Sequence, residues 1–236
     1  MKAVILFFLA ATTISFSSYA QLGKKGNYTH MMSHGIGISF QKFDGLNARI
    51  GGLPQYKALR DYTGTLQLGV LKERNRLISE MGLIAGSSMS GDRDEKSSTI
   101  RFLGINANIG YDLVPNDRIM LYPFAGLGYE IYQARFFKDN SSVAFNDVLQ
   151  SPTVQNNIRP VDFKNGFFTY RAGFGVLLSS PKNNHGAIGL QAGYTGSFNS
   201  RTWRSSHNQS LLNAPEDNLS RFFVSFVLSK RHTPMK

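Results

Sequence analysis

The sequence predicts an all-β fold: an eight-stranded antiparallel up-and-down transmembrane β-barrel with short periplasmic turns and long outer loops. Large apolar residues occupy one parity of eight successive segments, and polar residues and glycines occupy the other parity. The links between the segments are short and long in alternation. A small membrane barrel needs this pattern, because its outer face meets acyl chains while its inner face lines a narrow lumen.

The alternation places the strands along the chain. In the fourth segment Leu103 and Ile105 share one face, and Gly104 lies on the other. Leu71 and Ile84 interrupt the pattern in the second and third segments. The expected strands cover residues 33–43, 62–72, 75–89, 98–113, 118–136, 166–179, 186–199 and 219–230.

A water-soluble barrel with the apolar parity inside is the alternative. About 32 large apolar side chains share that parity, whereas an eight-stranded interior is only just wide enough for side chains to fill. Glycines would then weaken strands facing water. The membrane orientation is therefore favoured, with these glycines inside: Gly35, Gly37, Gly69, Gly82, Gly86, Gly104, Gly110, Gly126, Gly128, Gly173, Gly175, Gly189 and Gly193.

The connections give the barrel its direction in the membrane. Short links over 72–75, 114–117 and 180–186 carry turn residues such as Pro115 and Asn116. The long links are rich in Asn, Ser, Gly and charge, and they cover residues 44–61, 90–97, 137–165 and 200–218. In outer-membrane barrels the short turns face the periplasm. We therefore expect both chain ends on the periplasmic side.

The first twenty residues have the three parts of a secretory signal peptide. Lys2 begins the segment, an apolar run follows, and the small-x-small site Ser18-Tyr19-Ala20 predicts cleavage near Ala20. Since no cysteine is present, a lipoprotein anchor is excluded. The expected organisation is a signal peptide over 1–20, an N-terminal periplasmic segment over 21–32, a transmembrane barrel over 33–230 and a basic C-terminal tail over 231–236.

The net charge of +11 is concentrated at the end of the barrel with the short turns. The expected basic periplasmic rim consists of Lys72, Arg74, Arg76, Arg118, Lys182, Lys230 and Arg231. These cations have no aromatic stacking platform beside them, so we expect no nucleic-acid partner. Attraction to anionic headgroups of the inner leaflet is one interpretation. The other is that basic residues only bracket the apolar band.

Four charges fall on the inward parity: Glu80, Glu130, Arg171 and Arg221. Glu130 and Arg171 lie in the outer halves of neighbouring strands, which makes an ion pair between them plausible. An unpaired carboxylate in a narrow lumen would cost too much free energy. The charge network is interpreted either as a plug that satisfies lumen charges or as a gate.

No convincing catalytic site is present, and we expect neither enzymatic activity nor a metal or other cofactor. His207 has Ser205, Ser206 and Asp217 nearby in sequence, but a Ser-rich loop produces such neighbours by chance. Ten aromatic residues gather toward the strand ends, where interfacial girdles use such rings. They are Tyr111, Tyr122, Tyr129, Tyr132, Tyr170, Tyr194, Phe198, Trp203, Phe222 and Phe226.

Over Ser33–Lys230 these segments resemble the small eight-stranded bacterial outer-membrane barrels, such as OmpX and the transmembrane domain of OmpA. The chain also resembles the outer membrane protein β-barrel domain family of Bacteroidetes envelopes, whose PorT-like members are linked to secretion. The resemblance implies an outer-membrane location and insertion by the barrel assembly machinery. One departure is that Leu228, Ser229 and a basic tail follow Phe226, where such barrels end on an aromatic residue.

The expected role is structural or binding, exercised through the outer loops, above all residues 137–165. A narrow transport or secretion-associated barrel is the second hypothesis, and a lipid-modifying enzyme is the third. The expected partners are outer-membrane lipids, the assembly machinery and an extracellular ligand or envelope protein. The barrel itself is expected to be a monomer.

Overall fold

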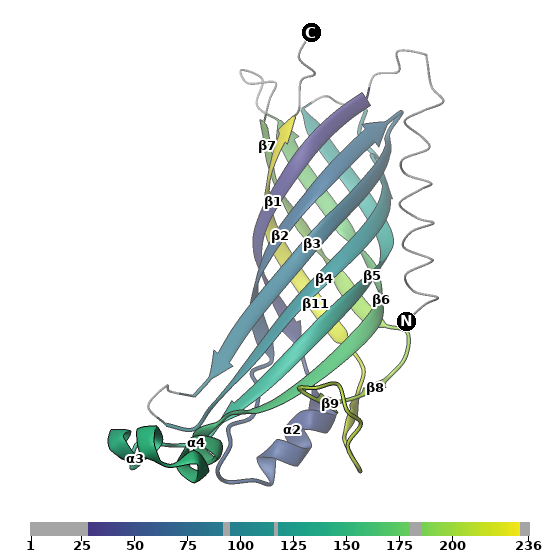
Figure 1. The fold of residues 1–236 in the computed structure, drawn as a ribbon. Helices are drawn as coiled ribbons and strands as arrows, with labels where there is room; N and C mark the ends of the chain where they lie inside the picture. Colours follow the sequence, from purple (N-terminus) through teal and green to yellow (C-terminus); the bar gives the residue numbers. More distant parts are fainter. Residues whose placement is uncertain (1–27, 92–94, 116–117, 180–185, 232–236) are drawn as a thin grey trace.

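The computed structural model describes residues 28–91, 95–115, 118–179 and 186–231, which form a closed barrel (Figure 1). The expected signal peptide, most of the N-terminal segment, Lys182 and the tail beyond Arg231 lie outside the described residues. The barrel strands are β1 (Tyr28–Gln41), β2 (Tyr62–Arg74), β3 (Leu77–Ser90), β4 (Ser97–Tyr111), β5 (Ile119–Phe137), β6 (Val161–Ser179), β7 (Gly186–Ser197) and β11 (Ser220–Arg231).

Each strand pairs antiparallel with its neighbours, in the order β5-β4-β3-β2-β1-β11-β7-β6. A ladder between β5 and β6, running from Ile119↔Leu178 to Phe136↔Val161, closes the cylinder. The predicted eight-stranded up-and-down barrel is confirmed. Three strands are longer than predicted: β1 begins at Tyr28, β6 begins at Val161, and β2 ends at Arg74.

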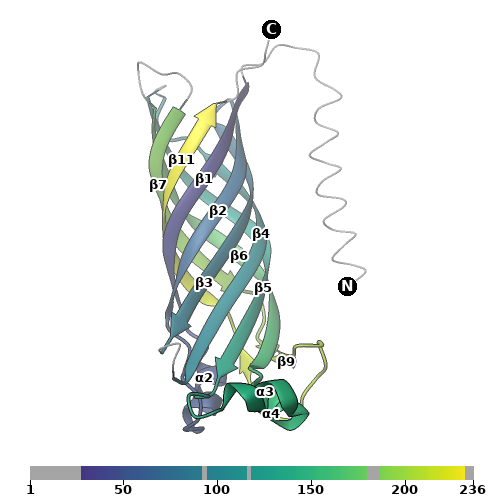
Figure 2. The same cartoon turned by 60° about the vertical axis from the view of Figure 1, so that its left-hand side comes forward.

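The short turns and the long loops lie at opposite ends of the barrel (Figure 2). Asn75 and Arg76 form a two-residue hairpin turn in which both residues have positive φ, 49° and 69°. This combination defines the turn type that matches the twist of paired strands. The long loops carry the remaining elements: α2 (Asp44–Gly51), α3 (Phe145–Gln150), α4 (Pro152–Ile158), β8 (Arg201–Thr202), β9 (Arg204–Ser205) and β10 (Glu216–Asp217).

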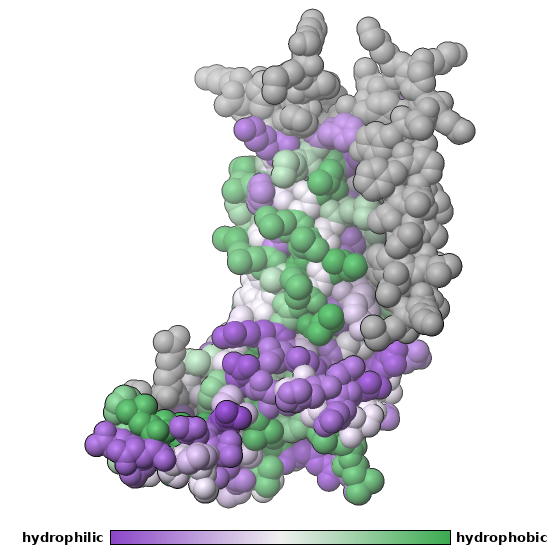
Figure 3. Space-filling view, in the orientation of Figure 1, coloured by the Kyte–Doolittle hydropathy of each residue, from purple (hydrophilic) through white to green (hydrophobic). Residues whose placement is uncertain are grey.

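The apolar parity faces outward, as predicted. Ile36, Ile109, Phe174 and Phe222 are each more than 60% exposed. Figure 3 shows such side chains as a belt across the middle of one face of the barrel. On β5 the outward apolar residues run from Ile119 to Ile131, a height of roughly 30 Å for strands tilted by about 40°. This height matches a bilayer core and excludes the alternative with apolar residues inside.

Beyond the belt the inside-outside pattern inverts. On β5 the outward residues become Gln133 and Arg135, while the inward residues Ala134 and Phe136 are completely buried. This part of the barrel protrudes into water, so it has a polar exterior and an apolar interior. The inversion explains why the predicted strand began too late, at residue 166. Asp162 faces outward on β6, and a polar outward residue does not fit the apolar-outward pattern that was used to locate the strands.

Two apolar clusters fill the two ends of the lumen. Leu71 belongs to the cluster near the short turns and Ile84 to the one under the long loops, which explains why both interrupt the predicted pattern. Tyr122, Tyr132 and Trp203 were expected in an interfacial girdle, but that expectation is wrong. Their side chains point inward and have no exposed surface.

Glycine allows these rings to fit inside the narrow cylinder. A Cβ atom added to Gly175 would lie within 2.8 Å of two ring carbons and the hydroxyl oxygen of Tyr122. Such contacts require the ring to shift. No helix in the described part of the chain is long and apolar enough to cross a membrane.

Candidate functional site: the charged lumen and the folded outer loops

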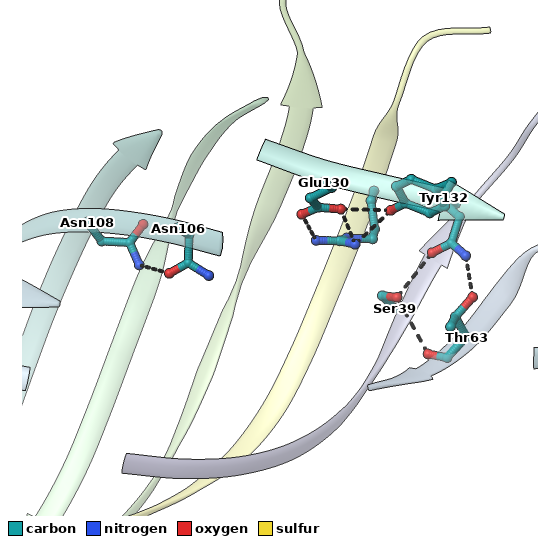
Figure 4. Close-up of polar contacts among 8 residues, drawn as sticks. Ser39, Thr63, Asn106, Asn108, Glu130 and Tyr132 are labelled. Atoms are coloured by element: carbon teal, nitrogen blue, oxygen red, sulfur yellow. Dashed lines mark hydrogen bonds and ion pairs between the residues drawn. The ribbon is translucent and has the colours of Figure 1, made fainter. Parts of the chain in front are cut away.

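A buried ion pair crosses the lumen between β5 and β11. Arg221 donates from Nη2 to Oε1 of Glu130 at 2.6 Å and from Nη1 to Oε2 at 2.8 Å. Tyr132 donates its hydroxyl proton to Glu130 at 2.8 Å and accepts from Arg221 at 2.8 Å. The guanidinium also lies 4.5 Å from the centre of the Phe102 ring. Figure 4 shows Glu130 and Tyr132 side by side in this network.

The sequence suggested an ion pair between Glu130 and Arg171, and that expectation is wrong. Glu130 pairs with Arg221 instead. The strand register gives the reason. Glu130 lies opposite Phe167 on β6, whereas Arg171 lies opposite Gly126. The four-residue offset separates the two charges by roughly 13 Å along the strands.

Arg171 instead lies over aromatic rings. Its guanidinium is 4.1 Å from the centre of the Phe223 ring and 5.5 Å from that of Phe124. Among the described residues, no acceptor contacts its Nε and Nη2 atoms. Stacking on two rings partly offsets the cost of burying this cation.

Glu80 is held by amide groups. Asn108 donates to its carboxylate at 3.1 Å, and Gln191 approaches both oxygens at 3.3 and 3.4 Å. Gln191 also contacts the Tyr122 hydroxyl at 2.8 Å and accepts from Gln67 at 3.1 Å. These bonds join five strands across the lumen, so Glu80 is part of a fixed network.

A third polar network, also drawn in Figure 4, lies on β1 and β2. Ser39 donates to Gln41 at 3.1 Å, and Gln41 donates to Thr63. All three side chains are buried. Polar layers thus occupy the part of the lumen between the two apolar clusters. Glu80, Glu130 and Arg221 are hydrogen-bonded, Arg171 lies on aromatic rings, and all four residues are buried, so the arrangement can plug the barrel.

Asp217 ties the first long loop to the last one. Its carboxylate accepts the backbone N–H groups of Gly45 at 2.7 Å and Leu46 at 3.0 Å, at the N-terminus of α2. It also accepts the indole N–H of Trp203 at 2.7 Å. A carboxylate is stabilising at this end of a helix. A Cβ atom on Gly45 would lie 2.4 Å from the carbonyl oxygen of Glu216, so the contact requires glycine.

An aromatic core lies beneath these loops. Phe43 packs edge-on against Tyr132 and Trp203, with ring centres 5.2 and 5.5 Å apart. Asn47 in α2 closes the same loop by accepting the Leu59 N–H at 2.9 Å and donating to the Leu59 carbonyl at 3.3 Å. The first and last long loops are therefore folded onto the outer end of the barrel.

The third long loop has a different character. Its helices α3 and α4 contain no buried residue, and they project beside the outer end of the barrel (Figures 1 and 2). Phe145 is 74% exposed and Leu149 is 63% exposed, one turn apart on α3. In the same loop the Ser141 N–H donates to Asp139 at 2.8 Å, which lowers the pKa of that carboxyl below its ordinary value.

The sequence neighbours of His207 do not assemble a catalytic triad. The Ser206 Oγ and His207 Nδ1 atoms are 3.1 Å apart on the exposed surface. Asp217, however, is buried and uses its oxygens on α2 and Trp203. Among the described residues, no group of three potential metal ligands occurs.

The residues of the basic rim lie at the end of the barrel with the short turns. Lys72 and Arg74 end β2, Arg118 precedes β5, and Lys230 lies near the end of β11. Arg76 has a local structural role, since it donates to the Asp112 carbonyl at 2.9 Å and lies 5.1 Å from the Tyr111 ring centre. Binding of lipid headgroups by this basic rim remains a prediction.

Sequence reasoning missed the contact between Asp217, Gly45 and Trp203. The three residues are separated by up to 172 positions, and they meet only because the barrel brings its first and last loops to one end. A single tryptophan in the whole sequence was the only local signal.

Comparison with solved structures identifies the class of fold. A major outer membrane protein from Thermus thermophilus aligns with a TM-score of 0.55 and 11% identity, covering 87% of this chain and 100% of that chain. The attachment invasion locus protein Ail of Yersinia pestis, solved with the heparin analogue sucrose octasulfate, aligns with a TM-score of 0.51 and 13% identity, covering 87% and 99%. No protein-family model and no curated protein matches the chain.

At these identities the comparison concerns the fold. Together with the apolar belt it defines the class of fold: the chain is a transmembrane β-barrel with the architecture of these outer-membrane proteins.

Proposed function

We propose that this protein is a non-conducting membrane anchor that presents a folded extracellular platform for binding. The observation that carries the proposal is the packing of the lumen. Tyr122 near the short turns and Tyr132, Phe136 and Phe167 under the long loops have no exposed surface. A barrel sealed by packed side chains at both ends cannot carry water and ions as a porin does.

The outer loops support the binding part of the proposal. Loops that are fastened by Asp217 and packed on Phe43 lose little conformational entropy when a partner binds. The α3–α4 pair adds an exposed apolar surface at Phe145 and Leu149. Exposed apolar side chains that protrude from a polar surface are typical of interaction sites. We take the partner to be an extracellular ligand or envelope protein and the barrel to be a monomer inserted by the assembly machinery.

Planar-bilayer recording tests the first part. The purified protein, folded as shown by heat-modifiable gel migration, should give no steady conductance. Truncating the plug at both ends, with Tyr122→Ala, Tyr132→Ala and Phe167→Ala together, should open intermittent conductance in the fraction that shows heat-modifiable migration. Steady single-channel currents from the native protein would contradict the proposal and favour a transport role.

Site-specific photo-crosslinking on intact cells tests the second part. A photoreactive residue at Phe145 should give an adduct of defined mass on the cell surface. The matched control is the same residue at Asn156, exposed on α4. The photoreactive residue is also placed at Leu149. Equal labelling at Phe145 and Asn156, or no labelling at either Phe145 or Leu149, would argue against binding by this loop.

A further inference from the structure

Three cations form one row on the outer surface of the barrel, at the border of the apolar belt. Arg101 on β4 lies opposite Gln133 on β5, and Gln133 lies opposite Lys164 on β6. The short strand β9 continues the row, since its Arg204 lies opposite Lys164. Neighbouring strands are about 4.8 Å apart, so the row is roughly 14 Å wide.

Among the residues that the structure describes, no acidic side chain forms an ion pair with this row. The next row away from the apolar belt contains Asp162, but Arg135 binds that carboxylate through two hydrogen bonds of 2.8 and 2.9 Å. Gln133 donates to the same carboxylate at 3.2 Å. Within the described part of the chain, no hydrogen bond or ion pair engages the side chains of Arg101, Lys164 and Arg204.

The depth of the row in the membrane follows from the residues below it. Toward the bilayer, the next row of residues on the outer surface is Leu103, Ile131 and Gly166. The row after it includes Tyr129 and Phe168. Five ring contacts join Tyr129, Phe168, Phe198, Tyr170, Tyr194 and Phe222 into a continuous aromatic ribbon.

Such rings sit at headgroup level. The three cations therefore lie where the headgroups of the outer leaflet meet the protein, and Figure 3 shows hydrophilic side chains gathered directly beside the belt.

From these observations we infer that Arg101, Lys164 and Arg204 form a binding site for a phosphate-bearing glycolipid of the outer leaflet. The cations would bind headgroup phosphates as charge-assisted donors. The acyl chains would lie along the apolar and aromatic residues of β5 and β6. The site is lateral and specific to one side of the barrel, and it does not depend on the platform function proposed above.

Trp203 provides a built-in reporter, because it is the only tryptophan and directly precedes Arg204. The experiment measures energy transfer from Trp203 to dansyl-labelled bisphosphorylated lipid A at trace level in phosphatidylcholine vesicles. The test variant is R101Q/K164Q/R204Q. The control R49Q/K57Q/R159Q removes the same charge from exposed loop positions. Each protein must first show the heat-modifiable gel migration of the native protein, which establishes that its barrel is folded.

The native protein and the control variant should show strong transfer, whereas the test variant should require roughly tenfold more lipid for the same transfer. Unlabelled lipid A should compete, and its dephosphorylated form should compete weakly. Equal transfer in the native and test proteins would overturn the inference. So would equal loss in the control, which would indicate general electrostatics. Competition by inorganic phosphate at the lipid concentration would indicate a site for free phosphate and would also overturn it.

Discussion

Glu130 and Arg221 meet across the barrel interior in a two-bond ion pair, with donor–acceptor distances of 2.6 and 2.8 Å and less than 5% of either residue exposed. The pair joins β5 to β11, two strands that do not neighbour each other in the sheet. It therefore braces the cylinder across its interior, in addition to the hydrogen bonds around its wall.

Breaking this pair should strongly destabilise the barrel. Glu130→Gln or Arg221→Gln leaves one buried partner charge without its counter-ion, and each single change should lower the free energy of unfolding by about 3–5 kcal/mol. Removing both charges should cost less than the sum of the single changes. Urea unfolding in lipid vesicles measures all four proteins of the cycle, and additive losses would show that the two residues are not coupled.

Asp217 should stabilise the outer platform and not the transmembrane part. Asp217→Ala removes the acceptor of two α2 backbone N–H groups and of the Trp203 indole, each a bond to a charged group worth about 1.5–3 kcal/mol. We expect protease cleavage within residues 42–61 and red-shifted Trp203 fluorescence, with heat-modifiable migration unchanged. Glu216→Ala is the control, because Glu216 is exposed and bonds only Thr202 at 3.1 Å among the described side chains. A protected loop in the Asp217 variant would contradict this role.

The basic rim should promote insertion into anionic bilayers. Lys72→Gln, Arg74→Gln and Arg76→Gln together remove three positive charges from the end of the barrel with the short turns. Each cation near an anionic surface contributes about 1 kcal/mol of attraction. The folding yield should fall in vesicles containing phosphatidylglycerol but not in pure phosphatidylcholine. Since Arg76 also contacts Asp112 and Tyr111, equal losses in both lipids would indicate a structural role alone.

The transmembrane part of the fold could be predicted from the sequence because the bilayer imposes a simple rule there. Outward residues such as Leu103 and Ile109 must be apolar, so period-two alternation locates the strands directly. The rule no longer applies where the barrel leaves the membrane. Asp162 and Arg135 face water in that region, and Phe136 faces inward.

Lumen pairing was harder to predict for a geometrical reason. Sequence parity shows that Glu130, Arg171 and Arg221 all face inward, but the pairing depends on the stagger between strands. The contact of Asp217 with α2 depends in the same way on which loops share an end. Contacts across the interior are therefore not determined by periodicity within any one strand.

The continuation of β5 and β6 beyond the apolar belt has a consequence for what can reach this protein. On β6 the rows of Lys164 and Asp162 lie beyond the lipid-facing residues, and the α3–α4 pair is attached beyond them. The paired strands place the helical pair on the far side of the cationic row from the apolar belt. A bulky macromolecule could contact Phe145 and Leu149 without approaching the bilayer itself.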